Sequence, residues 1–351
     1  TDIVGKGGIE EAFEHDLAGT KGEKHVYLDT VGRITEVIGE TQSTTGHDVY
    51  LTIDSRLQVK LYDLLEDKLT EIVLSHLIES GEKYVYDSGG ALIDLYILMP
   101  EVYFVLIDND LVSFDQLRDP KTDLEKSVNE RYEERLKQET DWLSNELKGE
   151  GTKYNDLSDE NKSYVWRAYE ILTENNIIRS DLVNIEDDVI ENWNNGANVS
   201  FKELLEHCII NGWVDLSDIS DSQYTDLSEV YSKVISYIVE KVSEDREFCL
   251  NIYKYLIEDG VVSGREMCML LYEQGYLEKD DYYNSLSNWT LSASDYIRAA
   301  MNNKVLTPGT LGIAPSSGAA VLEDPNNGQL LALVSYPGYD TNKLSGTMDV
   351  D

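Results

Sequence analysis

Three cysteines and five histidines are the residues of this sequence best suited to bind a transition metal, but their spacing argues against such a site. Cys208, Cys249 and Cys268 form no Cys-x-x-Cys pair, and only His207 lies next to one of them. Zinc sites need three or four such ligands at short, recurring spacings. Because each cysteine lies among apolar residues with helical periodicity, we expect three buried, unpaired thiols.

Carboxylates with a spacing similar to that of calcium ligands occur twice. The run Asp108-Asn109-Asp110 begins like a calcium loop, but Ser113 stands where such a loop has glycine and Asp119 where it has glutamate. A second group is only superficially similar and consists of Asp215, Asp218 and Asp221. The sequence contains neither H-E-x-x-H nor G-x-x-x-x-G-K-[ST]. We therefore expect no metal site and no cofactor site.

One serine has the spacing of an activated nucleophile. A lysine three residues after a serine can help to remove the hydroxyl proton when the serine opens a helix, and Ser80-Gly81-Glu82-Lys83 has this spacing. Apolar periodicity that runs to Leu77 instead places Ser80 at the end of a helix, with Gly81 as its stop. Ser127-Val128-Asn129, a possible partner motif, lies within a charged helical run. The sequence therefore predicts no catalytic residue.

Charge excludes several classes of partner. The 351 residues include 67 Asp and Glu against 29 Lys and Arg, which gives a formal net charge of −38. Such a chain is repelled by nucleic-acid phosphates and by anionic lipid headgroups. The longest apolar stretch, residues 91–106, is interrupted by Asp94, Pro100 and Glu101. It is too short and too charged to span a bilayer, and no basic leader precedes it.

The two ends of the chain show strand patterns around tight turns. Residues 24–38 alternate about a turn at 29–32, and residues 49–53 read as a strand. Residues 318–342 read as two buried strands, the second being the apolar run 330–334. Asn327-Gly328 between them supplies the positive φ angles that a hairpin turn requires. A helix beginning at Asp54 or Ser55 has an apolar face through Val73.

The middle of the chain, roughly residues 75–306, has helical patterns almost throughout. Capping boxes begin at Ser200 and at Ser263, and Gly212 and Gly275 follow as stops. Residues 227–242 form an amphipathic stripe, while helices beginning at Pro100 and covering 124–147 are also predicted. No fixed period is apparent, so we do not expect a solenoid of strict repeats. The 23 tyrosines are typical either of half-buried helix faces or of a partner or glycan surface.

Three segments resemble class B penicillin-binding proteins. Residues 318–342, GAAVLEDPNNGQLLALVSYPGYDTN, are similar to the opening hairpin of the transpeptidase domain. Residues 48–58, DVYLTIDSRLQ, resemble the segment that leads into that domain. Residues 5–22 resemble a motif of the pedestal domain, although Ala18 stands where the family usually has arginine. The three segments occur in the family's order.

The resemblance implies an α+β protein in which a mainly helical insertion is flanked by small β-containing pieces. We expect residues 1–47 to be the end of the pedestal, residues 48–74 and 307–351 the start of the transpeptidase domain, and residues 75–306 the insertion. The family's Ser-x-x-Lys, Ser-x-Asn and Lys-[Thr/Ser]-Gly motifs follow the opening hairpin. None of them lies between Lys343 and Asp351, so we expect a fragment that lacks the catalytic residues.

The parent implied by the resemblance is a bacterial peptidoglycan D,D-transpeptidase of the elongation type, active in cell-wall synthesis and cell shape. It acts on peptidoglycan stem peptides and is acylated by β-lactams. It is anchored in the cytoplasmic membrane with this portion outside, through an anchor absent from this sequence. An alternative is a non-catalytic module whose insertion binds cell-wall elongation proteins or glycan. A β-lactam sensor is the third hypothesis, and the pedestal motif argues against it.

Overall fold

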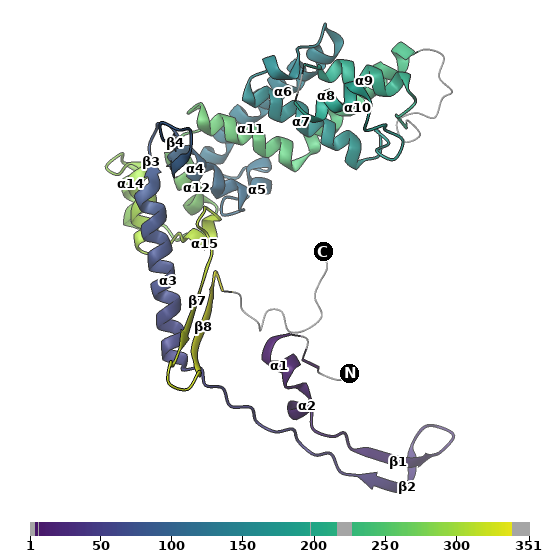
Figure 1. Cartoon of the computed structure of the whole chain (residues 1–351), viewed down its shortest axis with the longest axis vertical. Coiled ribbons are helices and arrows are strands. Elements are labelled where there is room, and N and C mark those ends of the chain that lie inside the picture. Colours follow the sequence, from purple (N-terminus) through teal and green to yellow (C-terminus); the bar gives the residue numbers. More distant parts are fainter. Residues whose placement is uncertain (1–3, 6, 197, 216–226, 339–351) are drawn as a thin grey trace. The chain divides into compact units, whose positions relative to one another are not determined.

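The structure is a computed structural model that describes residues 4, 5, 7–196, 198–215 and 227–338 (Figure 1). Its described residues form two compact units, one made of the residues up to 64 together with 319–338 and the other of residues 65–318. The chain is therefore α+β, with two-stranded sheets and a large helical unit. This fold class is the one predicted from the sequence.

The first unit begins with two short helices and a hairpin. Helices α1 (Gly8–Ala12) and α2 (Glu14–Leu17) are separated at Phe13. Strands β1 (Glu23–Leu28) and β2 (Ile34–Thr41) pair antiparallel, which confirms the predicted hairpin. Its turn is stabilised by Asp29, because one carboxylate oxygen accepts hydrogen bonds from the backbone amides of Val31 and Arg33, both at 2.9 Å.

Helix α3 (Ser55–His76) begins where the sequence predicted it to begin. The Asp54 carboxylate accepts from the amides of Arg56 at 2.9 Å and Leu57 at 3.3 Å, so it satisfies amides that the first turn leaves unpaired. The strand predicted for residues 49–53 is wrong, because this segment has no regular strand pairing. A strand requires a continuous ladder with a neighbour, whereas Thr52 binds β8 through its side-chain hydroxyl.

Strands β7 (Gly318–Glu323) and β8 (Leu330–Tyr336) form the predicted terminal hairpin. Of the two turn residues, only Gly328 has a positive φ, at +73°. The prediction that both strands are buried is wrong. Ala332, Val334 and Tyr336 are buried, whereas Leu330 is 40% exposed and Leu333 is 54% exposed. The hairpin therefore buries one face of β8 and leaves the other uncovered among the described residues. The last motif residues, beyond Gly338, lie outside the described part.

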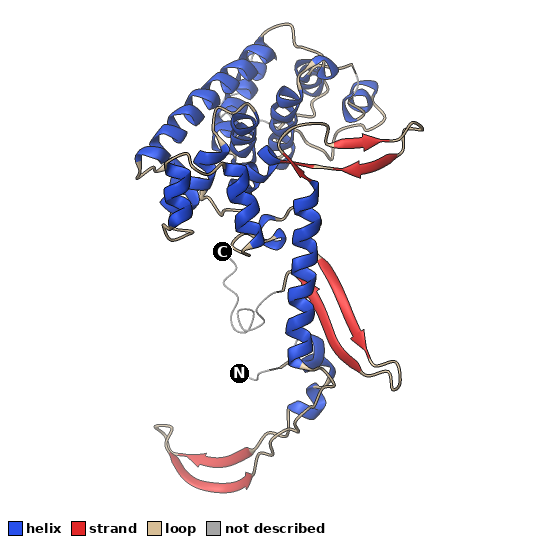
Figure 2. Cartoon of the chain, turned by 90° about the vertical axis from the view of Figure 1, so that its left-hand side faces the viewer, coloured by secondary structure: helices blue, strands red, loops and turns tan. Residues whose placement is uncertain are grey.

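Helices make up most of the second unit (Figure 2). After α3 they are α4 (Met99–Asp108), α5 (Phe114–Arg118), α6 (Asp123–Lys148), α7 (Asp159–Glu174), α8 (Asp188–Asn194), α9 (Phe201–Ile210), α10 (Leu227–Glu244), α11 (Arg246–Glu258), α12 (Gly264–Glu273), α13 (Asp281–Ser287), α14 (Ala293–Asn302) and α15 (Pro308–Leu311). Helix α11 packs against α4, α6 and α7, and α10 packs against α6, α7 and α9. One continuous apolar core runs through these helices.

The predicted capping boxes are both present. Ser200 and Ser263 each accept from the amide three residues ahead, while Glu203 and Glu266 accept from the amides of the two serines. Pro100 lies in the first turn of α4, as the sequence indicated, and α6 covers the predicted helix 124–147 with Gly149 as its C-cap. The run Pro308-Gly309-Thr310 lies in the short helix α15, which is capped by Thr307.

Six helix ends of this unit share one junction, in which a residue with left-handed backbone conformation follows the helix and the amide two residues later donates to the carbonyl six positions before that amide. At the end of α11, Gly260 has φ +71°, and the amide of Val262 donates to the Leu256 carbonyl at 2.9 Å. The other five junctions centre on Asp110, Asn176, Gly275, Trp289 and Lys304. From Gly260 onward they recur every 14 or 15 residues, at 260, 275, 289 and 304. This recurrence was not predicted from the sequence, because the residue type at the left-handed position differs from one junction to the next.

Two small sheets between α3 and α4 were also not predicted from the sequence. Strands β3 (Leu77–Ile78) and β6 (Ile97–Leu98) pair parallel, and between them β4 (Tyr84–Tyr86) and β5 (Leu92–Leu95) form an antiparallel hairpin. Helix α3 therefore ends at His76, four residues before Ser80. The missed signal was Tyr84-Val85-Tyr86 followed by the turn residues Asp87-Ser88-Gly89-Gly90, a typical hairpin pattern.

Candidate functional site

The serine with nucleophile spacing does not open a helix. Ser80 is exposed in a bend after β3, and Gly81 beside it has φ +139°. Lys83 forms an ion pair with Glu101 at 2.8 Å, so its ammonium group is already engaged. Ser127 is exposed in the second turn of α6, where its carbonyl accepts a hydrogen bond from the Arg131 side chain. These positions offer no helix N-terminus at which a serine and a lysine could act together.

The other candidate residues lie apart from one another. The three cysteines are buried and unpaired, as predicted. Burial raises the pKa of Cys208 to about 12 and also raises those of Cys249 and Cys268. Asn109 donates to the Leu311 carbonyl, and Asp110 pairs with Arg246, so this run binds its own chain. Asp218 and Asp221 lie outside the described residues. No group of three His, Cys, Asp or Glu side chains that could hold a metal ion occurs in the described part.

Two segments that are far apart in the sequence meet in the first unit, at the start of α3 and along β8. The Thr52 hydroxyl donates to the Leu330 carbonyl at 2.5 Å, and the Asp54 amide donates to the Leu331 carbonyl at 2.9 Å. Gln58 then binds Leu333 twice, since its amide nitrogen donates to the carbonyl at 2.5 Å and its oxygen accepts from the amide at 2.8 Å. At this point of β8, the Gln58 side chain makes the two backbone hydrogen bonds that a neighbouring strand would otherwise make.

Aromatic packing continues the same contact. The rings of Tyr62 on α3 and Tyr336 on β8 lie 5.4 Å apart, and the Tyr62 hydroxyl accepts from the Gly338 amide at 3.3 Å. The buried face of β8 therefore packs on the first turns of α3. Residues 52–62 and 330–338 form one local structure, although about 270 residues separate them in the sequence.

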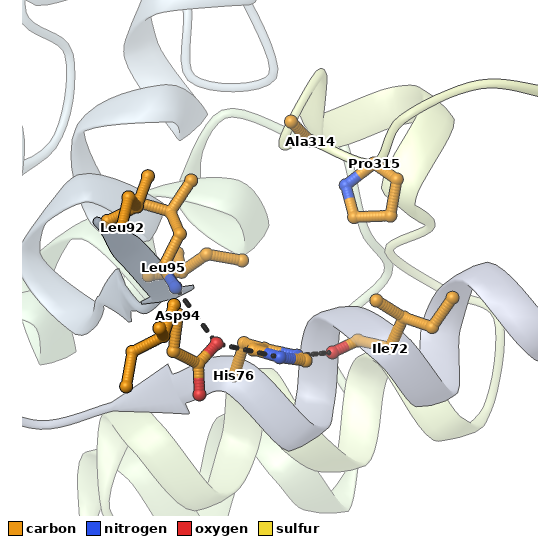
Figure 3. A pocket seen from close by; sticks show the side chains of 9 residues that line it. Ile72, His76, Leu92, Asp94, Leu95, Ala314 and Pro315 are labelled. Carbon is orange, nitrogen blue, oxygen red and sulfur yellow. Dashed lines mark hydrogen bonds and ion pairs between the residues drawn. The ribbon is translucent and has the colours of Figure 1, made fainter. Parts of the chain in front are cut away.

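A cavity of about 430 Å³ lies in the second unit, and we call it the hairpin pocket (Figure 3). Helix α3 contributes Ile72 and His76, the β5–β6 segment contributes residues 92–95 and Ile97, and the loop after α15 contributes Ala314 and Pro315. The side chains of Leu92 and Leu95 face the pocket from one side, opposite Ala314 and Pro315. Its lining is mostly aliphatic, with one imidazole and one carboxylate.

The polar pair of the hairpin pocket is held in place by its neighbours. His76 Nδ1 lies 2.8 Å from the Ile72 carbonyl, and Nε2 lies 3.4 Å from Asp94 Oδ1, so both ring nitrogens face oxygen acceptors. The same Asp94 oxygen accepts from the Leu95 amide at 2.9 Å. Arg298 donates to the Leu77 carbonyl at 2.7 Å and thereby satisfies an acceptor just past the end of α3. Hydrogen bonds therefore fix the side of the pocket that carries His76 and Asp94.

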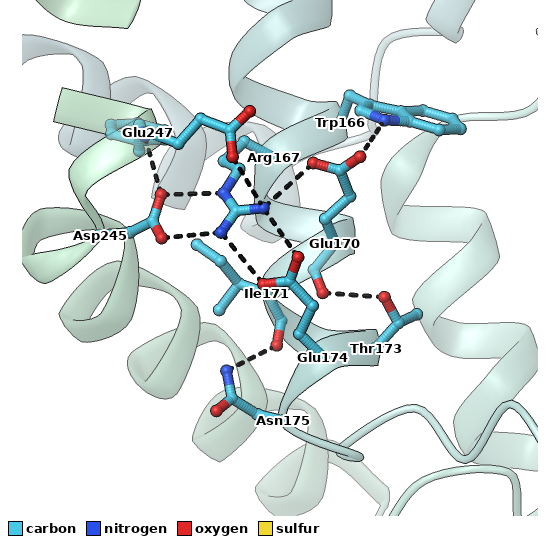
Figure 4. Close-up of polar contacts among 10 residues, drawn as sticks. Trp166, Arg167, Glu170, Ile171, Thr173, Glu174, Asn175, Asp245 and Glu247 are labelled. Atoms are coloured by element: carbon cyan, nitrogen blue, oxygen red, sulfur yellow. Dashed lines mark hydrogen bonds and ion pairs between the residues drawn. The ribbon is translucent and has the colours of Figure 1, made fainter. Parts of the chain in front are cut away.

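A second polar cluster surrounds Arg167 on α7 (Figure 4). Its guanidinium binds both carboxylate oxygens of Asp245, at 2.9 and 2.8 Å, and it also pairs with Glu170, Glu174 and Glu247. Burial favours the neutral form of Asp245, but hydrogen bonds from Arg167 and from the Phe248 amide outweigh it, so the pKa of Asp245 lies below its usual value. The cluster joins α7 to the start of α11, so we assign it a structural role.

The comparisons with known proteins agree with the local structure of the first unit. Residues 1–51 match the family model described as the penicillin-binding protein dimerisation domain. Penicillin-binding protein 3 of Bacillus subtilis (strain 168) is 43% identical over 67 residues, which are 19% of this chain and 9% of that protein. The resemblance to class B penicillin-binding proteins is confirmed.

Two further proteins that are similar to this chain come from Escherichia coli (strain K12). The peptidoglycan D,D-transpeptidase FtsI is 36% identical over 86 residues, which are 24% of this chain and 14% of FtsI. The peptidoglycan D,D-transpeptidase MrdA is 35% identical over 75 residues, which are 21% of this chain and 12% of MrdA. The matched parts thus span about a tenth of these relatives. No solved structure matches the chain. No described helix is long and apolar enough to cross a membrane.

Proposed function

We propose that this chain is a non-catalytic part of a bacterial peptidoglycan D,D-transpeptidase, interrupted by a helical insertion. The contact of Gln58 with Leu333 is the observation that carries the proposal. It joins the segment similar to the start of a transpeptidase domain to the segment similar to that domain's opening hairpin. When a domain is interrupted by an insertion, its two parts stay in contact. Two unrelated segments would not be expected to form such specific hydrogen bonds.

The proposed division follows the sequence motifs. Residues 1–47 belong to the pedestal, residues 48–74 and 307–351 begin the transpeptidase domain, and residues 75–306 form the insertion. The match of residues 1–51 to a dimerisation domain supports the first assignment. The names of FtsI and MrdA support the reaction class. In this proposal the nucleophilic serine belongs to a part of a longer protein that is not in this sequence. The substrates are peptidoglycan stem peptides, and β-lactams acylate the same serine.

The coding sequence beyond Asp351 tests this proposal. We expect a Ser-x-x-Lys motif followed by Ser-x-Asn and by Lys-Thr-Gly or Lys-Ser-Gly. That longer protein is expected to be anchored in the cytoplasmic membrane, with this portion outside. A continuation that lacks all three motifs would leave a degenerate relative without transpeptidase activity, and the proposal would be wrong.

A second function is favoured by the hairpin pocket and by the exposed apolar side chains around it. Single exposed apolar residues are ordinary, but a group of them beside a preformed cavity is typical of a binding surface. We propose that the insertion also binds another component of the cell-wall machinery. Removing residues 75–306 from the longer protein should then preserve acylation by penicillin but impair localisation or cell shape. Normal localisation and normal shape after this deletion would contradict a binding role.

A further inference from the structure

The hairpin pocket has the composition of a site for an apolar side chain. Six of its lining residues are aliphatic or proline on the side formed by β5, β6 and the loop after α15, and Ile72 closes it from α3. Ile93 is 64% exposed, and Leu92 and Leu95 are exposed beside it. A cavity of about 430 Å³ is near the lower end of the range for small-ligand sites. Because a cavity of about 150 Å³ already holds a benzene ring, this pocket has room for more than one apolar side chain but not for a large cofactor.

The lining argues against a sugar as the occupant. Sugars are held by several hydrogen bonds and by flat aromatic faces, and the pocket offers only His76 and Asp94 as polar groups. Both are already engaged, His76 with the Ile72 carbonyl and Asp94 with the Leu95 amide. No tryptophan or tyrosine lines the cavity. Burial of apolar surface is thus the main free energy that this site can supply.

The charged residues near the hairpin pocket restrict the kind of partner that can bind there. Residues 71–97 carry five carboxylates and one lysine, and that lysine, Lys83, is paired with Glu101. Residues 312–317, on the opposite wall, carry no charge. The pocket lining itself contains one carboxylate, Asp94, and no lysine or arginine, and the whole chain has a net charge of −38. A second copy of this chain, an acidic peptide or an anionic lipid surface would be repelled.

We propose that the hairpin pocket binds a basic polypeptide segment of another protein, which inserts aliphatic or aromatic side chains and places lysines or arginines near Asp94. Asp94 is the carboxylate nearest to the bound side chains, since it lines the cavity. This inference rests on the binding role proposed for the insertion and is independent of the reaction assigned to the longer protein.

Synthetic peptides test this proposal with the chain itself. Acetyl-Lys-Leu-Lys-Ile-Lys-Leu-Lys-amide supplies both features, a second peptide replaces every lysine with glutamate, and a third replaces every aliphatic residue with serine. Fluorescence anisotropy of labelled peptides measures the affinity. We expect the first peptide to bind at least about tenfold more tightly than either of the others, with weakening as salt is raised from about 50 to 500 mM.

Two variants locate the binding. Ile93→Asn removes an exposed apolar side chain from the pocket and should weaken the first peptide about tenfold. The matched control is Ile210→Asn, because Ile210 on α9 is also exposed but does not line the pocket, and it should leave the affinity unchanged. Asp94→Asn should reduce both affinity and salt dependence.

Equal binding of the glutamate peptide, undiminished binding to Ile93→Asn, or binding of none of the three peptides would overturn the proposal. Circular dichroism of each variant shows whether the fold is retained. A negative result here leaves the transpeptidase proposal intact, because that proposal is judged by the downstream motifs and by penicillin acylation.

Discussion

Replacement of Arg167 by methionine should destabilise the helical unit strongly. Methionine keeps most of the apolar stem but removes the guanidinium, and the side chain of Arg167 is only 12% exposed. Asp245 would then lose both of its short bonds, at 2.9 and 2.8 Å. Loss of one partner of a buried ion pair costs about 3–5 kcal/mol, whereas exposed pairs such as that with Glu247 contribute about 0–1 kcal/mol. We expect a loss of about 3 kcal/mol.

The melting temperature of the chain provides the assay. A loss of about 3 kcal/mol in a unit of this size lowers the melting temperature by about 9 °C, since each kcal/mol is worth roughly 3 °C. Lys68→Met is the matched control, because Lys68 pairs with Glu71 on an exposed surface, and it should shift the melting temperature by less than about 2 °C. Equal shifts for the two variants would refute the reasoning.

The same variant has a predictable pH dependence. The pKa of Asp245 is lowered in the folded protein because the bonds from Arg167 and the Phe248 amide outweigh the effect of burial. A lowered carboxyl pKa adds stability above the unfolded pKa, near 4, and this stability is lost as the pH falls through the folded value. The difference between wild type and Arg167→Met should therefore be large at pH 7 and shrink below about pH 4. A difference that stays constant with pH would show that Asp245 is not the main partner.

Three further predictions concern other parts of the chain. Glu125→Gln should cost about 1–3 kcal/mol in urea unfolding, because the glutamine carbonyl can still accept from the two backbone amides but carries no charge, and the new NH2 group would face the Gln116 amide nitrogen that donates to the buried carboxylate. Gln58→Ala should speed hydrogen exchange of the Leu333 amide about tenfold, since that amide loses its acceptor, and an unchanged rate would contradict the contact. Cys208 should react with Ellman's reagent at pH 8 only after unfolding, because burial raises the pKa of its thiol to about 12.

Features that depend on near neighbours in the sequence were predictable. The capping boxes at Ser200 and Ser263 involve residues three positions apart, so their residue types suffice to identify them. The same holds for the turn at Asp29 and for the start of α3 at Asp54. The family resemblance was also local, since it rests on three short motifs.

Features that depend on distant neighbours were not predictable. Residues 49–53 have strand-forming side chains but pair with no strand among the described residues. Leu333 is apolar like a core residue, yet it lies on a face of β8 that no described residue covers. Arg167 and Asp245 are 78 positions apart, and no periodicity relates them. The hairpin pocket was missed in part because its hairpin at 84–95 was overlooked. Its other wall, at Ala314, comes from the far end of the unit in sequence.

Acylation by a fluorescent penicillin tests the central claim most directly. The full-length protein that contains this chain should be labelled covalently, and the 351-residue chain alone should not, because the proposed nucleophile lies outside it. Excess unlabelled penicillin should abolish the labelling. Labelling of the isolated chain, or no labelling of the folded full-length protein, would contradict the account.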